Sequence, residues 1–297
     1  MEKDILIGTL VRADDTAENY LKQIIPYGFE SFAFTFGHNA AKIRDPEELA
    51  GKIMPLLEEN NIKVGAIGLY GNPLGETETD LSIRANLSKL VECAHLFKTD
   101  CVTGFTGRVP DSSIPDSIAK FKEVWTPIVD KAGELGVKVA FENCPMGGNW
   151  VKGSWNIAIN PSAWELMFEA IPLPNIGLEW EPCHQMTQLI DPIPQIKQWG
   201  KRFIHIHGKD ATIRRDLLAK YGFMSPEKFV WHRTPGFGDS NWKDIFTELR
   251  MVGFKGAIDI EGWHDPVYRG ELEMTGQVYG LNYLKDCRGG KLIPNPA

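Results

Sequence analysis

The sequence has few of the features that mark membrane-bound or secreted proteins. Its five cysteines are an odd number without a Cys-x-x-Cys pair, which argues against a disulfide framework and fits a reducing compartment. No stretch approaches the roughly 20 apolar residues of a membrane span. The first ten residues, MEKDILIGTL, do not have the character of a signal peptide. We therefore expect a cytoplasmic protein with no membrane partner.

The sequence also contains fewer basic than acidic residues. Lys and Arg number 32 against 39 Asp and Glu, and the formal net charge is −7. A protein that binds nucleic acid needs basic residues to neutralise phosphates. The densest basic group, formed by Lys209, Arg214 and Arg215, is too small for that purpose, so we expect no nucleic-acid partner.

What the sequence does contain is a regular alternation of β-rich runs and helical patterns. The segments 46–61, 80–97 and 114–136 carry apolar residues at three- and four-residue spacing, which predicts helices. Asp45-Pro46 marks a helix start, and Gly136 and Gly253 mark helix ends. Eight runs are predicted as strands: 5–10, 29–36, 63–71, 99–107, 138–144, 176–182, 203–211 and 256–263.

Eight strand–helix units predict an α/β fold, a single (β/α)8 TIM barrel over residues 1–297, with the active site at the C-terminal ends of the strands. The rival, an open doubly wound sheet, would be favoured by a GxGxxG motif after the first strand, and none is present. No linker-like segment divides the chain. Two long connections, about 144–160 and 212–241, follow strands and are expected to be lids or binding loops over the barrel mouth.

Four of the later strands end in side chains that can bind a metal: Glu142, Glu181, His207 and Glu261. Each is predicted to point into the barrel because side chains alternate along a strand. A single carboxylate in such a place is commonly a hydrogen-bonded structural group. Burying several together without a cation is unfavourable, however, so the set predicts a site for one divalent metal ion. Oxygen ligands with one imidazole suit manganese, magnesium or cobalt, with zinc as a further candidate.

A second polar set is expected one layer deeper in the barrel. Strand parity turns Ile204 and Ile206 outward and leaves Glu179, His205 and Asp259 facing inward. These three residues either orient the metal ligands from behind or form a paired polar core. In both cases His205 should find Glu179 or Asp259 as a hydrogen-bond partner.

The order of these residues resembles the xylose-isomerase-like barrel superfamily, and within it the sugar isomerases and epimerases of the tagatose-3-epimerase type. The matching pieces are Glu142 in FENC, Glu181-x-x-His184, His207-Gly-Lys209-Asp210 and Glu261. The resemblance implies a divalent cation, commonly manganese, magnesium, cobalt or zinc, at the residues matching Glu142, Glu181, His207 and Glu261. It also implies that His184 contacts a small-molecule substrate.

The sequence departs from that pattern in three places. Glu181 stands where the family usually has Asp. A further Glu of the epimerases falls on Gly148, and their substrate-binding Arg falls on Ile213, with Arg214 one residue later. The departures leave the particular sugar open, including whether it is phosphorylated. Whether the chain forms a homo-oligomer, such as a dimer or tetramer, also stays open.

The predicted chemistry is proton abstraction next to a carbonyl. A divalent ion would hold the enediolate oxygens as a Lewis acid. Glu142 and Glu261 approach from nearly opposite sides of the ring, so they are the candidate catalytic acid and base. One carboxylate on each face suits epimerisation, whereas an aldose–ketose isomerase needs only one. The predicted activity is therefore a metal-dependent sugar or keto-polyol isomerase or epimerase.

Four further residues are candidates for substrate binding. Lys209 and Arg214 follow strand seven, His38 follows strand two, and Trp150 lies in the loop after strand five. Two other histidines, His232 and His264, are expected simply to be solvated.

The same residue pattern leaves three alternative functions open. A metal-dependent dehydratase of the keto-inositol or dehydroshikimate type also needs proton abstraction beside a carbonyl. A DNA-repair endonuclease of the same barrel superfamily would require a cluster of metal-binding histidines and a basic surface for DNA. A non-catalytic binding barrel would have little use for a carboxylate-rich metal site.

Overall fold

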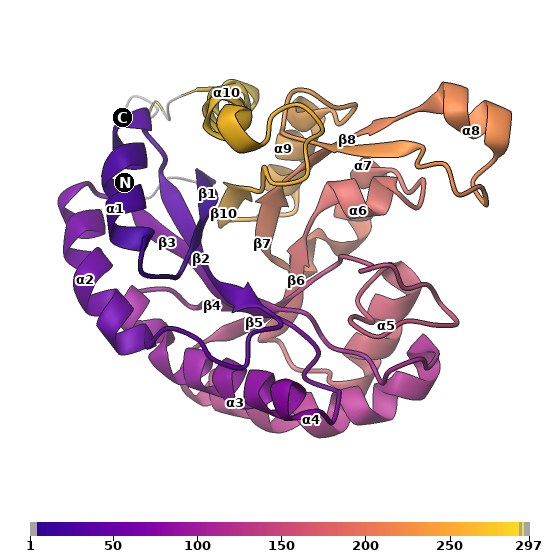
Figure 1. Cartoon of the computed structure of the whole chain (residues 1–297), viewed down its shortest axis with the longest axis horizontal. Helices are drawn as coiled ribbons and strands as arrows, with labels where there is room; N and C mark the ends of the chain where they lie inside the picture. The colour runs from indigo at the N-terminus through magenta and orange to yellow at the C-terminus, as the bar shows by residue number, and fades with distance from the viewer. Residues whose placement is uncertain (1–4, 291–292, 294–297) are drawn as a thin grey trace.

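Eight parallel strands close into a barrel in the computed structural model, which describes residues 5–290 and 293 (Figure 1). Around the ring the order is β1-β10-β7-β6-β5-β4-β3-β2. This arrangement confirms the predicted α/β fold class, a (β/α)8 TIM barrel. The barrel strands are β1 (Leu6–Arg12), β2 (Ser31–His38), β3 (Lys63–Tyr70), β4 (Cys101–Gly104), β5 (Lys138–Glu142), β6 (Ile176–Trp180), β7 (Phe203–Gly208) and β10 (Ala257–Ile260).

Helices surround the strands on the outside of the ring (Figure 1). Short 3-10 helices at Ile25–Tyr27, Ala94–Phe97, Gly200–Arg202 and Gly270–Leu272 complete the connections. Among the helices described, none is both long and apolar enough to cross a membrane. The α-helices are α1 (Ala17–Ile24), α2 (Pro46–Glu59), α3 (Glu78–Cys93), α4 (Ile114–Glu134), α5 (Pro161–Ala170), α6 (Pro182–Met186), α7 (Pro192–Trp199), α8 (Arg215–Tyr221), α9 (Trp242–Met251) and α10 (Glu273–Cys287).

The predicted helix boundaries have the expected local causes. Asp45 precedes α2, and its carboxylate accepts hydrogen bonds from the backbone N–H groups of Glu47 and Glu48, both at 3.0 Å. Gly136 and Gly253 follow α4 and α9 with positive φ angles of 71° and 82°, a conformation that favours glycine. These residues therefore fix where each helix begins or ends before the next strand.

The two faces of the barrel strands differ in chemistry. Residues facing the helices, such as Phe141, Trp180 and Ile258, belong to the main apolar core. The inner face of the lower barrel instead holds a small apolar cluster of Leu10, Ala33, Ala66, Cys101 and Ala140. Small side chains in this cluster leave room above it for the polar residues at the barrel mouth.

One parity prediction was wrong. Ile204 packs against the inner apolar cluster rather than facing the helices. The cause is a register irregularity between β6 and β7, where Phe203 pairs with Leu178 and His205 pairs with Glu179. An irregularity of this kind lets two neighbouring residues point to the same side of a sheet.

The two long connections take different forms. Residues 144–160 form an irregular loop between β5 and α5. The other connection contains an antiparallel hairpin of β8 (Asp210–Ile213) and β9 (Val230–Arg233), with α8 at its tip. Figure 1 shows α8 extending away from the barrel. Only the base of this connection lies at the mouth, so the predicted lid is correct in part.

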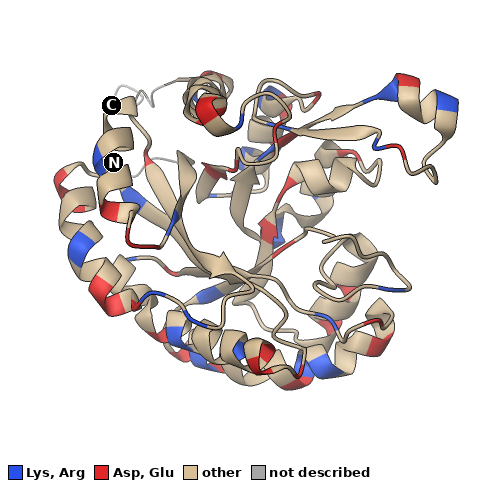
Figure 2. Cartoon of the chain, in the orientation of Figure 1, with Lys and Arg blue, Asp and Glu red and all other residues tan. Residues whose placement is uncertain are grey.

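Charged residues of both signs alternate along the outer helices (Figure 2). Acidic residues also occur at the centre of the barrel, away from this outer surface. The central group is the one relevant to function.

Candidate active site

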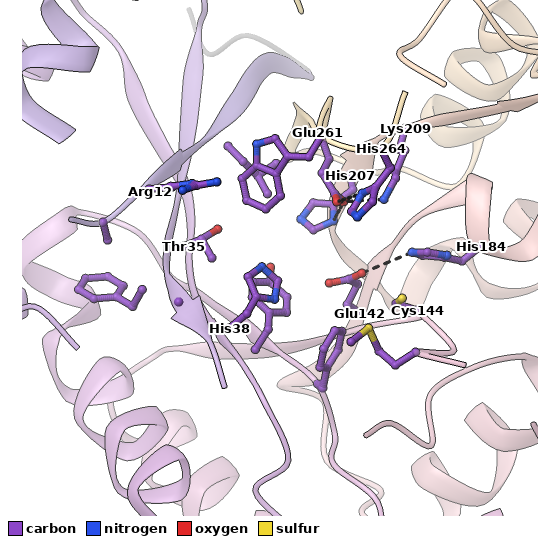
Figure 3. Close-up of a pocket in the computed structure, with 18 of the residues that line it drawn as sticks. Arg12, Thr35, His38, Glu142, Cys144, His184, His207, Lys209, Glu261 and His264 are labelled. Carbon is purple, nitrogen blue, oxygen red and sulfur yellow. Dashed lines mark hydrogen bonds and ion pairs between the residues drawn. The ribbon is translucent and has the colours of Figure 1, made fainter. Parts of the chain in front are cut away.

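A cavity of about 560 Å³ opens at the C-terminal ends of the strands (Figure 3). Its size lies in the range typical of small-molecule sites. Residues from strands all around the ring line it, together with loops that follow them: Leu10, Arg12, Ala13, Asp14, Thr35, Phe36, Gly37, His38, Tyr70, Phe105, Glu142, Cys144, Met146, His184, His207, Lys209, His232, Glu261, Trp263 and His264.

The four predicted metal ligands come together at this cavity, which Glu142, His207 and Glu261 line and beneath which Glu181 is fully buried. Glu142, Glu181, His207 and Glu261 each offer a ligand atom, and these atoms all lie within 4.8 Å of one another. His207 Nδ1 is 3.3 Å from both Glu181 Oε2 and Glu261 Oε2. Two ligands held about 2.1 Å from one tetrahedral ion lie roughly 3.4 Å apart. The spacing therefore fits a single divalent ion.

Two buried atoms of this group lack a hydrogen-bond partner among the described residues: Glu181 Oε1 and His207 Nε2. Glu181 Oε1 is 3.0 Å from His184 Nε2 and 3.2 Å from Lys209 Nζ. His207 Nε2 is 3.0 Å from Glu179 Oε1, but none of these contacts has the geometry of a hydrogen bond. Burial raises the pKa of Glu142 well above its usual range, although attraction to His207 opposes this effect. A cation held by the carboxylates and His207 Nδ1 would give Glu181 Oε1 a partner and would favour the charged form of Glu142. His207 Nε2 lies on the other side of the ring and faces Glu179.

Lys209 lies among the carboxylates, where it supplies a positive charge from the chain itself. Its ammonium Nζ donates to Glu261 Oε1 at 2.9 Å and is 3.2 Å from Glu181 Oε1. Burial disfavours the charged amine, but attraction to Glu181 and Glu261 outweighs burial and raises the pKa of Lys209 well above its usual range. The ammonium thus shares carboxylate oxygens with the metal that these residues would bind.

Replacing Lys209 with methionine should tighten Mn²⁺ binding by about tenfold or more, because a buried positive charge beside the ion is removed. The same change should lower the stability of the metal-free protein, since two buried carboxylates lose their counter-charge. Isothermal titration with MnCl₂ and urea unfolding in EDTA would measure the two effects. Weaker Mn²⁺ binding in the variant would show that Lys209 supports the metal rather than competing with it.

His184 lies beside the same carboxylates. Its Nε2 is 3.0 Å from Glu181 Oε1 and 3.7 Å from Glu142 Oε1 (Figure 3). The Glu181-x-x-His184 spacing spans one turn at the start of α6, which brings the two side chains together. Burial lowers the pKa of His184 well below its usual range. It is therefore a neutral imidazole that can exchange hydrogen bonds with a substrate hydroxyl.

An asparagine that sequence reasoning missed joins the ends of β5 and β6. The amide of Asn143 donates to the Glu181 carbonyl at 2.9 Å and accepts from the Glu181 N–H at 2.6 Å. This pair of bonds holds the backbone of Glu181 beside Glu142. Asn143 directly follows Glu142, and nothing else in the sequence marked it as part of the site.

The deeper polar layer is present, and it forms a continuous network. His205 Nδ1 is 2.8 Å from Glu179 Oε1, and His205 Nε2 is 2.7 Å from Asp259 Oδ2, as the parity argument predicted. Burial opposes a charged imidazole, but the hydrogen bonds to Asp259 and Glu179 raise the pKa of His205. Since Glu179 Oε1 is also 3.0 Å from His207 Nε2, this layer lies directly behind a candidate ligand.

A glycine on β3, across the barrel interior from Asp259, makes room for this network. A Cβ atom at Gly65 would collide with the Asp259 carboxylate. Tyr70, also on β3, donates its hydroxyl to Glu179 Oε2 at 2.7 Å. Tyr70 was not predicted, because a single Tyr at the end of a strand is equally consistent with an ordinary core residue.

His38 lines the cavity, as its position after strand two suggested. Its ring stacks on Tyr70 with centroids 5.1 Å apart, and it meets the Trp263 ring edge-on at 6.0 Å. Burial lowers the pKa of His38. These rings form an aromatic wall on one side of the cavity.

Two predicted substrate-binding residues are not brought to the cavity. Arg214 pairs with Asp216 at 2.7 Å and lies over the Trp231 ring on the protruding hairpin. The side chain of Trp150 is 39% exposed and lies outside the cavity lining. The carbonyl of Trp150 instead accepts hydrogen bonds from Ile114 and Arg108. The prediction for Trp150 assumed that a loop following a strand stays at the mouth, and the prediction for Arg214 followed its place one residue beyond the position of the family's substrate-binding Arg.

His232 was expected to be solvated, yet it lines the cavity from β9. Its ring lies 5.3 Å from that of His184 and 5.7 Å from that of His264. Burial and the positive charge of Lys209 lower the pKa of His232 to about 3. The hairpin base therefore contributes a neutral imidazole to the cavity wall, which strand patterns in the sequence could not reveal.

Comparison with known proteins places this geometry in context. The family model described as xylose isomerase-like TIM barrel matches residues 21–287. The uncharacterised protein YfiH of Bacillus subtilis (strain 168) is 27% identical over 255 residues, which cover 75% of this chain and 78% of YfiH.

Two further similarities are a local match in sequence and a match in fold. An inosose dehydratase of Clostridium tetani (strain Massachusetts / E88) is 28% identical over 103 residues, or 33% of this chain and 34% of that protein. A solved D-psicose 3-epimerase, crystallised in the presence of D-fructose, superposes with a TM-score of 0.71 at 16% identity. The superposition covers 96% of this chain and 100% of the epimerase and shows a shared fold.

Proposed function

Because the chain belongs to the xylose isomerase-like TIM barrel family, we propose that it is a divalent-metal-dependent isomerase or epimerase acting on a sugar or keto-polyol. Manganese is the first candidate ion, with magnesium, cobalt and zinc as alternatives. The substrate is a small molecule that fits the cavity at the barrel mouth.

One observation carries this proposal: Glu142, Glu181, His207 and Glu261 converge from four different strand ends to within 4.8 Å. Three carboxylates and one imidazole suit a divalent ion that also has to accept substrate oxygens. The ion, when bound, would act as a Lewis acid for an oxygen next to the reacting carbon.

The side chains around this group supply the remaining functions. Glu142 ends β5 and Glu261 directly follows β10. These strands lie three positions apart in the ring, so the two carboxylates can approach a substrate from two sides. One can remove the proton beside the carbonyl while the other returns it. His184 and Lys209 can donate hydrogen bonds to substrate oxygens, and Trp263, His38 and Tyr70 exclude water.

A dehydratase is the second candidate, and two observations favour it. The local similarity to an inosose dehydratase points to related chemistry, although it covers only a third of this chain. Lys209 also places a buried ammonium next to Glu261, where it could stabilise a departing hydroxyl. Both activities begin with the same proton abstraction.

Turnover in deuterated water distinguishes these possibilities. The Mn²⁺-loaded protein should be screened against ketoses and keto-polyols, with products followed by NMR. An epimerase or isomerase should leave deuterium on the carbon beside the carbonyl, at C3 for a 3-epimerase and at C1 or C2 for an isomerase. Release of water without an isomeric sugar would favour the dehydratase, whereas no turnover of any member with several metals would contradict both.

A further inference from the structure

The wall of the cavity formed by β1 and β2 carries a cation for which the proposed reaction has no role. Arg12 ends β1, and β1 lies opposite β5 in the ring. Figure 3 shows Arg12 pointing into the cavity from the side opposite Glu142 and His184. A ligand that reaches both sides would therefore have one end at the carboxylate group and the other at Arg12.

Arg12 has no carboxylate partner among the described residues. Its guanidinium lies over the Trp263 ring, 5.5 Å from the centroid, and that contact leaves its N–H groups available. Lys209, the other permanent cation in the cavity lining, has two carboxylates within 3.2 Å. Asp14 also lines the cavity, but its carboxylate accepts hydrogen bonds from the N–H and hydroxyl of Thr16.

Thr35 provides an independent indication of a ligand at this place. It is the register partner of Arg12 on β2 and lines the same part of the cavity (Figure 3). The residue is only 6% exposed, and its remaining exposed surface is at the cavity that it lines. A hydroxyl at the cavity surface, held by an otherwise buried residue, can donate a hydrogen bond to a ligand beside Arg12.

We propose that Arg12 and Thr35 form a subsite for an anionic group of the substrate, a phosphate ester or a carboxylate, at the end remote from Glu142. A planar guanidinium binds the oxygens of either group through paired N–H donors, and the Thr35 hydroxyl adds a further donor. The inference rests on the proposed function for the reacting end. It narrows the substrate to sugar phosphates or sugar acids.

Two matched ligand pairs test this subsite by isothermal titration: D-fructose with D-fructose 6-phosphate, and D-glucose with D-glucuronate. At least one anionic ligand should bind about 10- to 100-fold more tightly than its neutral partner, as expected for a charge-assisted contact. Arg12→Gln should abolish that preference without weakening the neutral ligand. Thr35→Val should reduce it severalfold, and Arg12→Lys should retain part of it.

Arg214→Gln is the matched control, because Arg214 is an arginine outside the cavity and should leave the preference unchanged. Each titration is done with and without Mn²⁺, so the subsite is assessed even if no metal binds. No preference for either anion in the unmodified protein, or a preference that survives Arg12→Gln, would overturn the subsite. Failure of Mn²⁺ to bind would count against the proposed function alone.

Discussion

Replacing His207 with alanine should weaken Mn²⁺ binding by at least about 100-fold and abolish metal-dependent turnover, since losing even an outer partner of a ligand commonly lowers affinity 10- to 100-fold. His207 is the only imidazole in the four-residue ligand group, and it is 3.3 Å from two of the three carboxylates. Without the imidazole ring, nothing separates the negatively charged carboxylates of Glu181 and Glu261. Titration with MnCl₂ and metal analysis after dialysis would measure the change.

Glu181→Gln is a second test, because it keeps the shape of the side chain and removes only the charged ligand. His38→Ala is the control, since His38 lines the cavity but lies outside the ligand group. Circular dichroism would establish that each variant folds. Unchanged Mn²⁺ affinity in both ligand variants would contradict this site, and an ion held instead by Cys183, His184 and His232 would identify a different one.

Replacing His205 with alanine should destabilise the protein by about 3–5 kcal/mol, the range expected when a buried charge network loses one partner. His205 bridges Glu179 and Asp259, and all three residues are fully buried. Without the imidazole, two carboxylates remain in the barrel interior with fewer partners. Equilibrium unfolding in urea, followed by circular dichroism in EDTA, would give the difference in unfolding free energy.

His95→Ala serves as the comparison, because His95 is exposed and contacts only the Glu92 carbonyl in its own turn. That variant should change stability by less than about 0.5 kcal/mol. If His205→Ala does not fold, the milder Asp259→Asn should still show a clear loss. A His205→Ala protein as stable as the His95 variant would mean that the network contributes nothing to folding.

The barrel and the centre of the site were predictable because each depended on a repeated pattern. Eight strands alternated with helices, and four strands each ended in a metal-capable residue. Strand parity then placed Glu142, Glu181, His207 and Glu261 on the inner face without knowledge of the tertiary structure. Agreement among several strands made the inference stronger than any single residue could.

The predictions that were wrong, and the residues that were not predicted, depend on backbone detail or on single residues. Ile204 was placed outward because parity assumes a regular register, and β6 and β7 have an irregular one. Arg214 was expected at the mouth, but the chain turns into the hairpin and carries it away. Arg12 and Tyr70 stand alone at their strand ends and Thr35 lies within β2, so nothing in the sequence distinguished them from ordinary surface or core positions.

The buried ammonium of Lys209 has a consequence for the order of events during synthesis. A cluster of carboxylates that depended on a metal for neutrality would couple folding to metal supply. Here the chain brings its own counter-charge to Glu181 and Glu261, so the newly made protein can complete its barrel before any ion arrives. In the proposed enzyme, the identity of the ion is then decided after folding, by which divalent metal is abundant and competes best with the lysine.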